Sequence, residues 1–79
     1  MNVDTVVDLS AGNPGAIRVL YELAEANNMA GVLRLKDVGI RGPGIWILYK
    51  ARCDCDLSKL RDLLAVASDE ELKQKAQGC

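Results

Sequence analysis

Apolar residues recur at helical spacing over residues 14–25. One face of this segment is apolar at four positions: Ile17, Leu20, Tyr21 and Ala24. Asn13 suits the capping position before a helix, and Pro14 suits the first turn because its missing N–H has no helical partner there. The spacing therefore predicts a helix that begins at Pro14 and ends at Asn27 and Asn28.

Helical patterns continue along the rest of the chain. Residues 29–38 repeat apolar side chains every three to four positions and are followed by Gly39, which suits a helix C-terminus. Partial alternation within this segment leaves a strand as the alternative. Residues 45–52 also have helical spacing, and a stripe of leucines follows a cap at Asp54 or Asp56.

The two ends of the chain differ from this middle. Residues 1–10 hold a short apolar segment broken by polar residues, which we expect to form an extended N-terminal arm. Ser68 and Glu71 fit a capping box that opens a polar C-terminal helix and tail over residues 68–79. The fold class predicted for residues 1–79 is mainly α. We expect a single domain, a compact bundle of four to five short helices with the N-terminal extended segment.

The composition indicates a small, aliphatic core. The chain has 79 residues, 49% of them hydrophobic, with no phenylalanine, one tryptophan and two tyrosines. A domain of this size buries little apolar surface, and burial against a second copy is a common source of further stability. We therefore expect a homo-oligomer. Ten basic and eleven acidic residues give a net charge of -1, without the positive excess that binds a nucleic-acid polymer.

Catalytic and metal chemistry have little support in the sequence. No histidine is present, so the usual general base near neutral pH is missing and we expect no enzymatic activity. Cys53, Cys55 and Cys79 alone are too few ligands for a zinc site, and we expect neither a metal nor a cofactor. Cys53 is expected to be buried at a helix end, with Cys55 in the following loop. The odd cysteine count, without a secretory signal or a long apolar run, favours a cytoplasmic protein with no membrane span.

Two glycine-containing segments, residues 12–16 and 39–44, are typical of loops that hold an anion. Each precedes a helix, where small residues let a ligand approach backbone N–H groups at the positive end of the helix dipole. Arg41 adds a planar donor suited to phosphate, and Trp46 and Tyr49 are suited to contact a base. The predicted ligand-binding residues are Asn13, Gly15, Arg18, Arg41, Gly42, Gly44, Trp46, Tyr49 and Lys50. The alternative is ordinary helix capping, with Trp46 and Tyr49 in the core or at an interface.

Three short segments of the chain together resemble a family of small proteins found in phages and bacterial genomes. Its members carry an N-P-G-A helix start, a G-I-x-G loop and an I-W-x-x-Y-K-D-x-C helix, followed by a leucine-rich helix. The corresponding segments here are residues 13–16, 39–42 and 45–53, and the resemblance covers residues 9–64. The chain departs from the family pattern at two positions: Ala51, where the family often has Asp, and Asp54, where it often has Gly.

The chain is also similar by type to small oligomeric phage proteins that sequester the cyclic nucleotide signals of bacterial immunity, such as anti-CBASS and anti-Thoeris proteins. This similarity implies a phage-encoded, non-catalytic sponge in the host cytoplasm. Its small phosphorylated ligand is expected to be a cyclic oligonucleotide or related nucleotide, sequestered to inhibit host defence. The alternative is a small protein-interaction module that inhibits or regulates a host or phage protein through its apolar helix faces.

Overall fold

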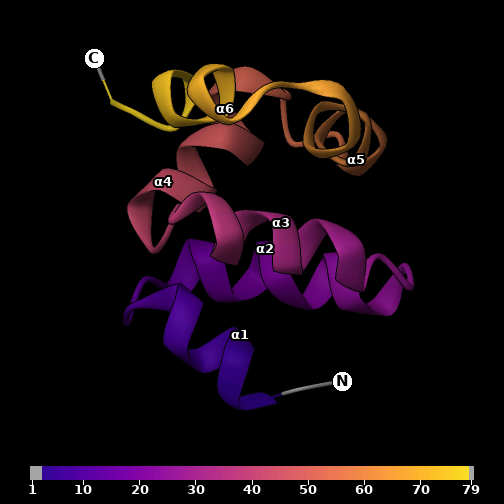
Figure 1. Cartoon of the computed structure of the whole chain (residues 1–79). Helices are drawn as coiled ribbons and strands as arrows, with labels where there is room; N and C mark the ends of the chain where they lie inside the picture. The colour runs from indigo at the N-terminus through magenta and orange to yellow at the C-terminus, as the bar shows by residue number, and fades with distance from the viewer. Residues whose placement is uncertain (1–2, 79) are drawn as a thin grey trace.

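The computed structural model describes residues 3–78, and within them the fold consists of helices and the turns that join them (Figure 1). The described elements are α1 (Val3–Ser10), α2 (Pro14–Glu25), α3 (Met29–Val38), α4 (Pro43–Ile47), the π-helical segment η1 (Leu48–Arg52), α5 (Leu57–Val66) and α6 (Asp69–Lys75). No strand occurs within residues 3–78. The molecule measures 28 × 23 × 22 Å along its principal axes. The mainly helical class predicted from the sequence is confirmed.

Local capping chemistry determines where the central helices begin and end. The side chain of Asn13 accepts a hydrogen bond from Ala16 N at 3.0 Å, so α2 begins at Pro14 as predicted. Gly39 ends α3 with a left-handed φ of 88°, a conformation that glycine adopts without strain. Because α3 is a continuous helix, the alternative of a strand in this segment is wrong.

The predicted extended N-terminal arm is also wrong, because its described part, residues 3–10, forms helix α1. Val6 and Leu9 are buried, and packing against α2 supplies the environment that fixes the helix. Eight residues make only about two turns of helix, too few for the apolar pattern to separate helix from extended chain. With α1 included, residues 3–78 contain six α-helices and η1, where four to five helices were expected.

The helices pack in an order that Figure 1 makes plain. Helix α1 lies at one end, α2 and α3 lie side by side in the middle with α4 next to them, and α5 and α6 lie at the other end. The core is aliphatic as expected, and its largest fully buried side chains come from several helices: Leu9, Leu20, Leu23, Leu35, Ile45, Leu48, Leu60 and Leu72.

The π-helical segment contacts the end of α6 through its last residue, Arg52. Arg52 Nε donates to Lys75 O at 3.0 Å, and its Nη2 donates to Gln77 O at 3.4 Å. These carbonyls lie at the C-terminal end of α6, where a helix lacks internal donors and a cation is favourable. Arg52 therefore fixes α6 beside η1.

Candidate functional site

The two glycine-containing segments predicted to hold an anion lie side by side. Gly42 N donates to Leu9 O at 2.8 Å, and a Cβ added to Gly42 would lie 3.2 Å from the Cβ of Ala11. Gly42 has a φ of 50°, which suits a residue without a side chain. The turn before α4 is thus packed against the turn between α1 and α2.

Most backbone donors in these turns are used within the protein. Ala16 N bonds to the side chain of Asn13, and Gly42 N bonds to Leu9 O. Gly44 N donates to Arg41 O at 3.1 Å, which closes a tight turn. At Asn13, Gly42 and Gly44 the structure therefore shows the capping and turn-forming roles that the sequence also allowed.

Arg41 makes an ion pair with α1. Its Nη2 donates to Asp8 O at 2.7 Å, and its two terminal nitrogens each lie 3.3 Å from an oxygen of the Asp8 carboxylate. Both side chains are exposed, at 50% for Arg41 and 66% for Asp8, so the pair is open to competition from solvent ions. Sequence reasoning missed this partner because 33 residues separate the two.

The aromatic pair lies on the face of α4 and η1 that packs on α2. A Cβ added to Gly15 would lie 2.6 Å from Trp46 Cδ2, so the indole rests directly on the α2 backbone. The Trp46 and Tyr49 ring centroids are 6.0 Å apart, and Lys50 Nζ lies 5.9 Å from the Trp46 ring centroid. Trp46 is half-buried and Tyr49 is buried, so only Trp46 and Lys50 offer an exposed surface to a base.

Arg18 and Glu22 continue this face along α2. Arg18 Nε lies 3.8 Å from Glu22 Oε1, the pairing expected one helical turn apart. Glu22 Oε2 is buried and receives no hydrogen bond of good geometry from residues 3–78. The Glu22 carboxylate nevertheless attracts the hydroxyl proton of Tyr49, and this attraction, followed by burial, raises the pKa of Tyr49 above its usual 10.0.

The raised pKa of Tyr49 predicts that the protein loses free energy of unfolding at alkaline pH. The unfolded chain releases the Tyr49 proton at a lower pH than the folded protein does. The contribution of neutral Tyr49 to the free energy of unfolding is therefore complete below pH 10.0 and is lost as the pH rises toward the folded pKa. The wild type is expected to lose more unfolding free energy than Tyr49→Phe across this range. Urea denaturation on either side of pH 10.0 measures the difference, and equal pH dependence of the two proteins would contradict it.

Two of the predicted residues line a cavity between the loop of residues 39–44 and α6, which we call the loop–α6 cavity. It has a volume of about 310 Å³ and is lined by Gly39, Ile40, Arg41, Gly44, Lys73, Ala76 and Gln77. Lys73 was absent from the sequence prediction, because no local pattern links the polar face of α6 to a loop some thirty residues earlier. The cavity holds two cationic residues and no carboxylate among its lining residues.

The nine predicted residues therefore do not form one pocket. A Cβ on Gly44 would face Ile40 Cγ2 at 3.2 Å and Ala76, toward the loop–α6 cavity, whereas the Trp46 ring covers Gly15. Arg41 and Gly44 belong to the cavity, and the predicted residues of α2 and η1 lie on the other face of α4.

Other chemistry has less support among the described residues. The hollow between Asn28, which caps α3, and α5 has a volume of about 390 Å³ and is lined by both Arg61 and Asp62, so its charge is mixed. Within residues 3–78 no group of three or more Cys, Asp or Glu side chains is placed to hold a metal ion.

The two described cysteines lie as the sequence predicts. Cys53 is buried, which raises the pKa of its thiol, and Cys55 is exposed in the following turn. Cys79 lies outside the described residues.

Comparison with known proteins leaves the resemblance to phage and bacterial proteins as a prediction. Within residues 3–78, no helix combines the length and the apolar character that crossing a membrane requires. No family model, curated protein or solved structure matches the chain.

Proposed function

We propose that the protein is a non-catalytic binding protein that holds a small phosphorylated ligand in the loop–α6 cavity. The observation that carries this proposal is that Arg41 and Lys73 both line a cavity whose lining residues include no carboxylate. The volume of about 310 Å³ falls within the range of small-molecule sites. Two cations at a concave surface are suited to phosphate: a phosphate monoester carries more negative charge than a carboxylate, and a cyclic oligonucleotide carries one charge on each of its several phosphodiester groups.

The present partners of both cations are exchangeable. Lys73 Nζ lies 4.0 Å from Glu70 Oε1, and these side chains are 52% and 82% exposed. Exposed ion pairs contribute about 0–1 kcal/mol because water competes for both charges. A phosphate that contacts Arg41 and Lys73 together replaces two weak pairs with one ligand, which favours its binding.

A nucleotide fits this proposal best if one ligand contacts both faces of α4. The cavity holds the phosphate, and Trp46 with Lys50 forms the exposed surface suited to a base. Because Trp46 and the cavity lie on different faces of α4, a ligand with several phosphates, or a second copy of the chain in a homo-oligomer, brings the two together. We therefore retain a cyclic oligonucleotide immune signal as the ligand and a phage-encoded sponge in the host cytoplasm as the biological role.

The test uses Lys73→Ala, with Lys59→Ala as a matched control. Lys59 has a similar exposure of 60% and a similarly loose partner, Asp54 at 3.7 Å, but does not line the cavity. Calorimetric titration with cyclic and linear nucleotides should show micromolar binding by the wild type and the control. A charged hydrogen bond contributes about 1.5–3 kcal/mol, so Lys73→Ala should bind at least about tenfold more weakly.

Two outcomes would contradict the proposal. If no nucleotide binds to the wild type at micromolar concentration, the ligand class is wrong. If ligand recovered after heat denaturation of the protein is chemically altered, the protein is catalytic.

Exposed apolar side chains favour a second candidate, a protein-interaction module. Five of them lie on α1, α2 and α3: Val3, Val7, Ile17, Tyr21 and Leu33, with Val7 the most exposed of these five at 58%, and Val66 at the end of α5 is also exposed. Apolar residues exposed on neighbouring helices are typical of a surface that binds another protein. This candidate is favoured over the first if one stoichiometric protein partner is lost in a Val7→Asp variant and no nucleotide raises the melting temperature.

A further inference from the structure

We infer that Asp8 is an internal competitor for the Arg41 guanidinium, which makes the loop–α6 cavity selective for ligands with at least two negative charges and couples their binding to release of α1. This inference rests on the proposed function, because it concerns the same cavity. It assigns a role to Asp8, a residue outside the cavity lining.

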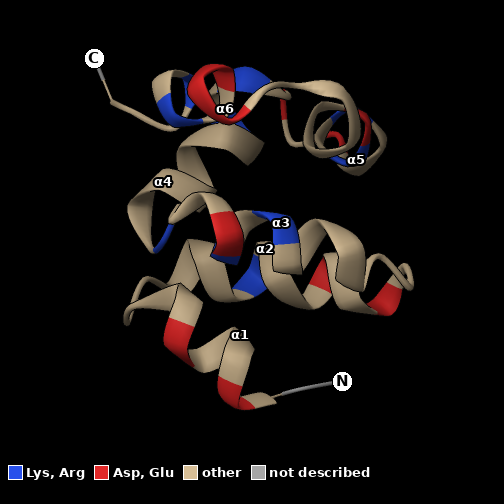
Figure 2. Cartoon of the chain, in the orientation of Figure 1, with Lys and Arg blue, Asp and Glu red and all other residues tan. Residues whose placement is uncertain are grey.

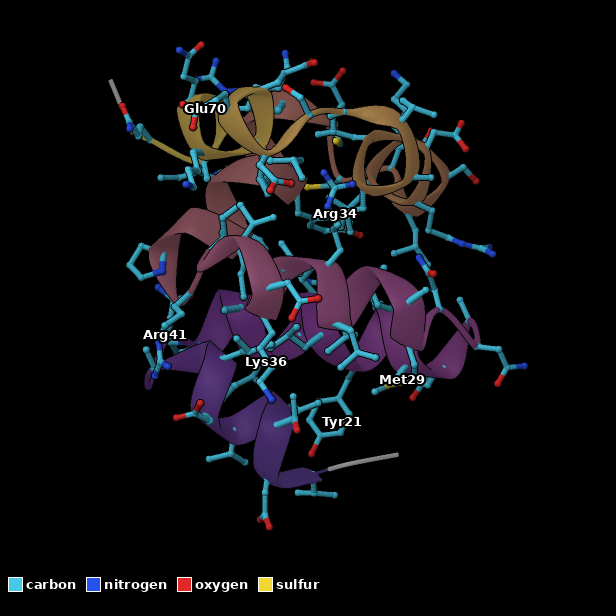
Figure 3. The ribbon with its side chains drawn as sticks, in the orientation of Figure 1. Tyr21, Met29, Arg34, Lys36, Arg41 and Glu70 are labelled. Carbon is cyan, nitrogen blue, oxygen red and sulfur yellow. The ribbon has the colours of Figure 1, made fainter. Side chains whose placement is uncertain are left out.

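The geometry shows a guanidinium held away from α6. Arg41 contributes to the cavity wall, but its Nη1 and Nη2 atoms bond to Asp8, with contacts of 2.7 Å to the backbone oxygen and 3.3 Å to each carboxylate oxygen. Figure 3 shows the Arg41 side chain pointing from the loop toward α1 and away from α6, which the Glu70 label marks. A phosphate in the cavity must therefore draw this guanidinium away from Asp8.

Competition of this kind discriminates by charge. Asp8 offers a single negative charge, and an incoming carboxylate offers no more, so exchange between them brings no electrostatic gain. A phosphate monoester dianion or a diphosphate carries a second charge and also reaches Lys73 across the cavity. Ligands of this class displace Asp8, and monoanions do not.

The same contact holds the C-terminal end of α1. Leu9 O accepts from Gly42 N at 2.8 Å, and Asp8 O accepts from Arg41, so residues of one loop satisfy carbonyls in the last turn of the helix. Helix α1 carries no basic residue in its last turn, and Figure 2 shows only acidic charges along it. Arg41 is therefore the cation that stabilises this helix end, and moving it into the cavity weakens α1.

The first measurement compares Asp8→Asn with the wild type and with Asp4→Asn as a control on the same helix. Calorimetric titration with inorganic pyrophosphate and with acetate, at low ionic strength, tests competition directly. Asp8→Asn is expected to bind pyrophosphate about fivefold more tightly than the wild type, the equivalent of one exposed ion pair. Acetate binding should stay undetectable for the wild type, and Asp4→Asn should match the wild type within about twofold.

The second measurement follows α1 in the wild type by hydrogen exchange, which needs no variant to fold. Pyrophosphate should speed amide exchange in α1 while leaving α5 unchanged. If both proteins bind pyrophosphate equally and exchange in α1 does not change, this inference is wrong and the proposed function stands. If neither the wild type nor Asp8→Asn binds pyrophosphate, the cavity is not a phosphate site, and both proposals are overturned.

Discussion

An Arg34→Ala variant is expected to lose about 3 kcal/mol of unfolding free energy, which is a large part of what a domain of this size possesses. Arg34 donates to Leu64 O at 2.7 Å, to Ala67 O at 2.7 Å and to Asp69 Oδ1 at 2.8 Å. Figure 3 shows this side chain reaching from α3 to the corner between α5 and α6. A single residue thus fixes the α5–α6 corner to the centre of the molecule.

The expected loss follows from what the substitution leaves behind. Leu64 O and Ala67 O lie at the C-terminal end of α5, where carbonyls lack helical donors, and the Arg34 side chain is only 27% exposed. Removing a charged donor from partly buried acceptors costs about 1.5–3 kcal/mol for each bond, although neighbouring bonds do not add fully. Lysine cannot donate to two carbonyls with the planar geometry of arginine, so Arg34→Lys should lie between alanine and the wild type.

Thermal and urea denaturation measure this loss. For a chain of 79 residues, 3 kcal/mol corresponds to a decrease in melting temperature of more than about 10 °C. Arg61→Ala is the matched control, because Arg61 is exposed on α5 and makes no hydrogen bond or ion pair within residues 3–78. The control should stay within about 0.5 kcal/mol of the wild type. A melting temperature for Arg34→Ala equal to that of the control would show that the α5–α6 corner is held by apolar packing alone.

A Gly15→Ala variant is expected to lose about 2 kcal/mol, even though alanine is the better helix former. The added Cβ would lie 2.6 Å from Trp46 Cδ2 and 2.7 Å from Trp46 Cε3. These atoms belong to a rigid ring that also contacts Tyr49, so the indole must move as a whole. The cost of overpacking should therefore exceed the gain in helix propensity.

A double-mutant cycle separates this contact from other effects of the substitution. Trp46→Leu removes the indole, so Gly15→Ala should cost less in that background than in the wild type. Gly78→Ala is the neutral control, because its added Cβ would meet its neighbour, Ile47 Cδ1, at an ordinary 3.5 Å. The same cost for Gly15→Ala in both backgrounds would disprove the steric explanation.

The fold was predictable from sequence where local chemistry decides the structure. The starts of α2 and α5 depend on Asn13 and Asp56, whose side chains bond to backbone N–H groups within three residues. A local sequence window contains all the atoms involved. Helix α1 was missed because tertiary burial of Val6 and Leu9, rather than its short pattern, stabilises it.

The candidate site was predictable only in part, for the same physical reason. The glycine-containing segments were found because glycine and proline restrict the local backbone. The partner of Arg41 and the second cation of the cavity lie in α1 and α6, about thirty residues away on either side. No local spacing encodes such pairings, which arise only when the helices pack.

The π-helical segment η1 gives the chain a difference in helical phase that ordinary α-helical winding would not supply. An α-helix turns by about 100° for each residue, and a π turn holds one residue more than an α turn. If the same five residues of η1 wound as an ordinary α-helix, Arg52 would rotate away from Lys75 O and Gln77 O. Everything after η1, including the α6 wall of the cavity, would then change its orientation relative to α2. The orientation of the α6 wall relative to α2 therefore depends on η1 keeping its π winding.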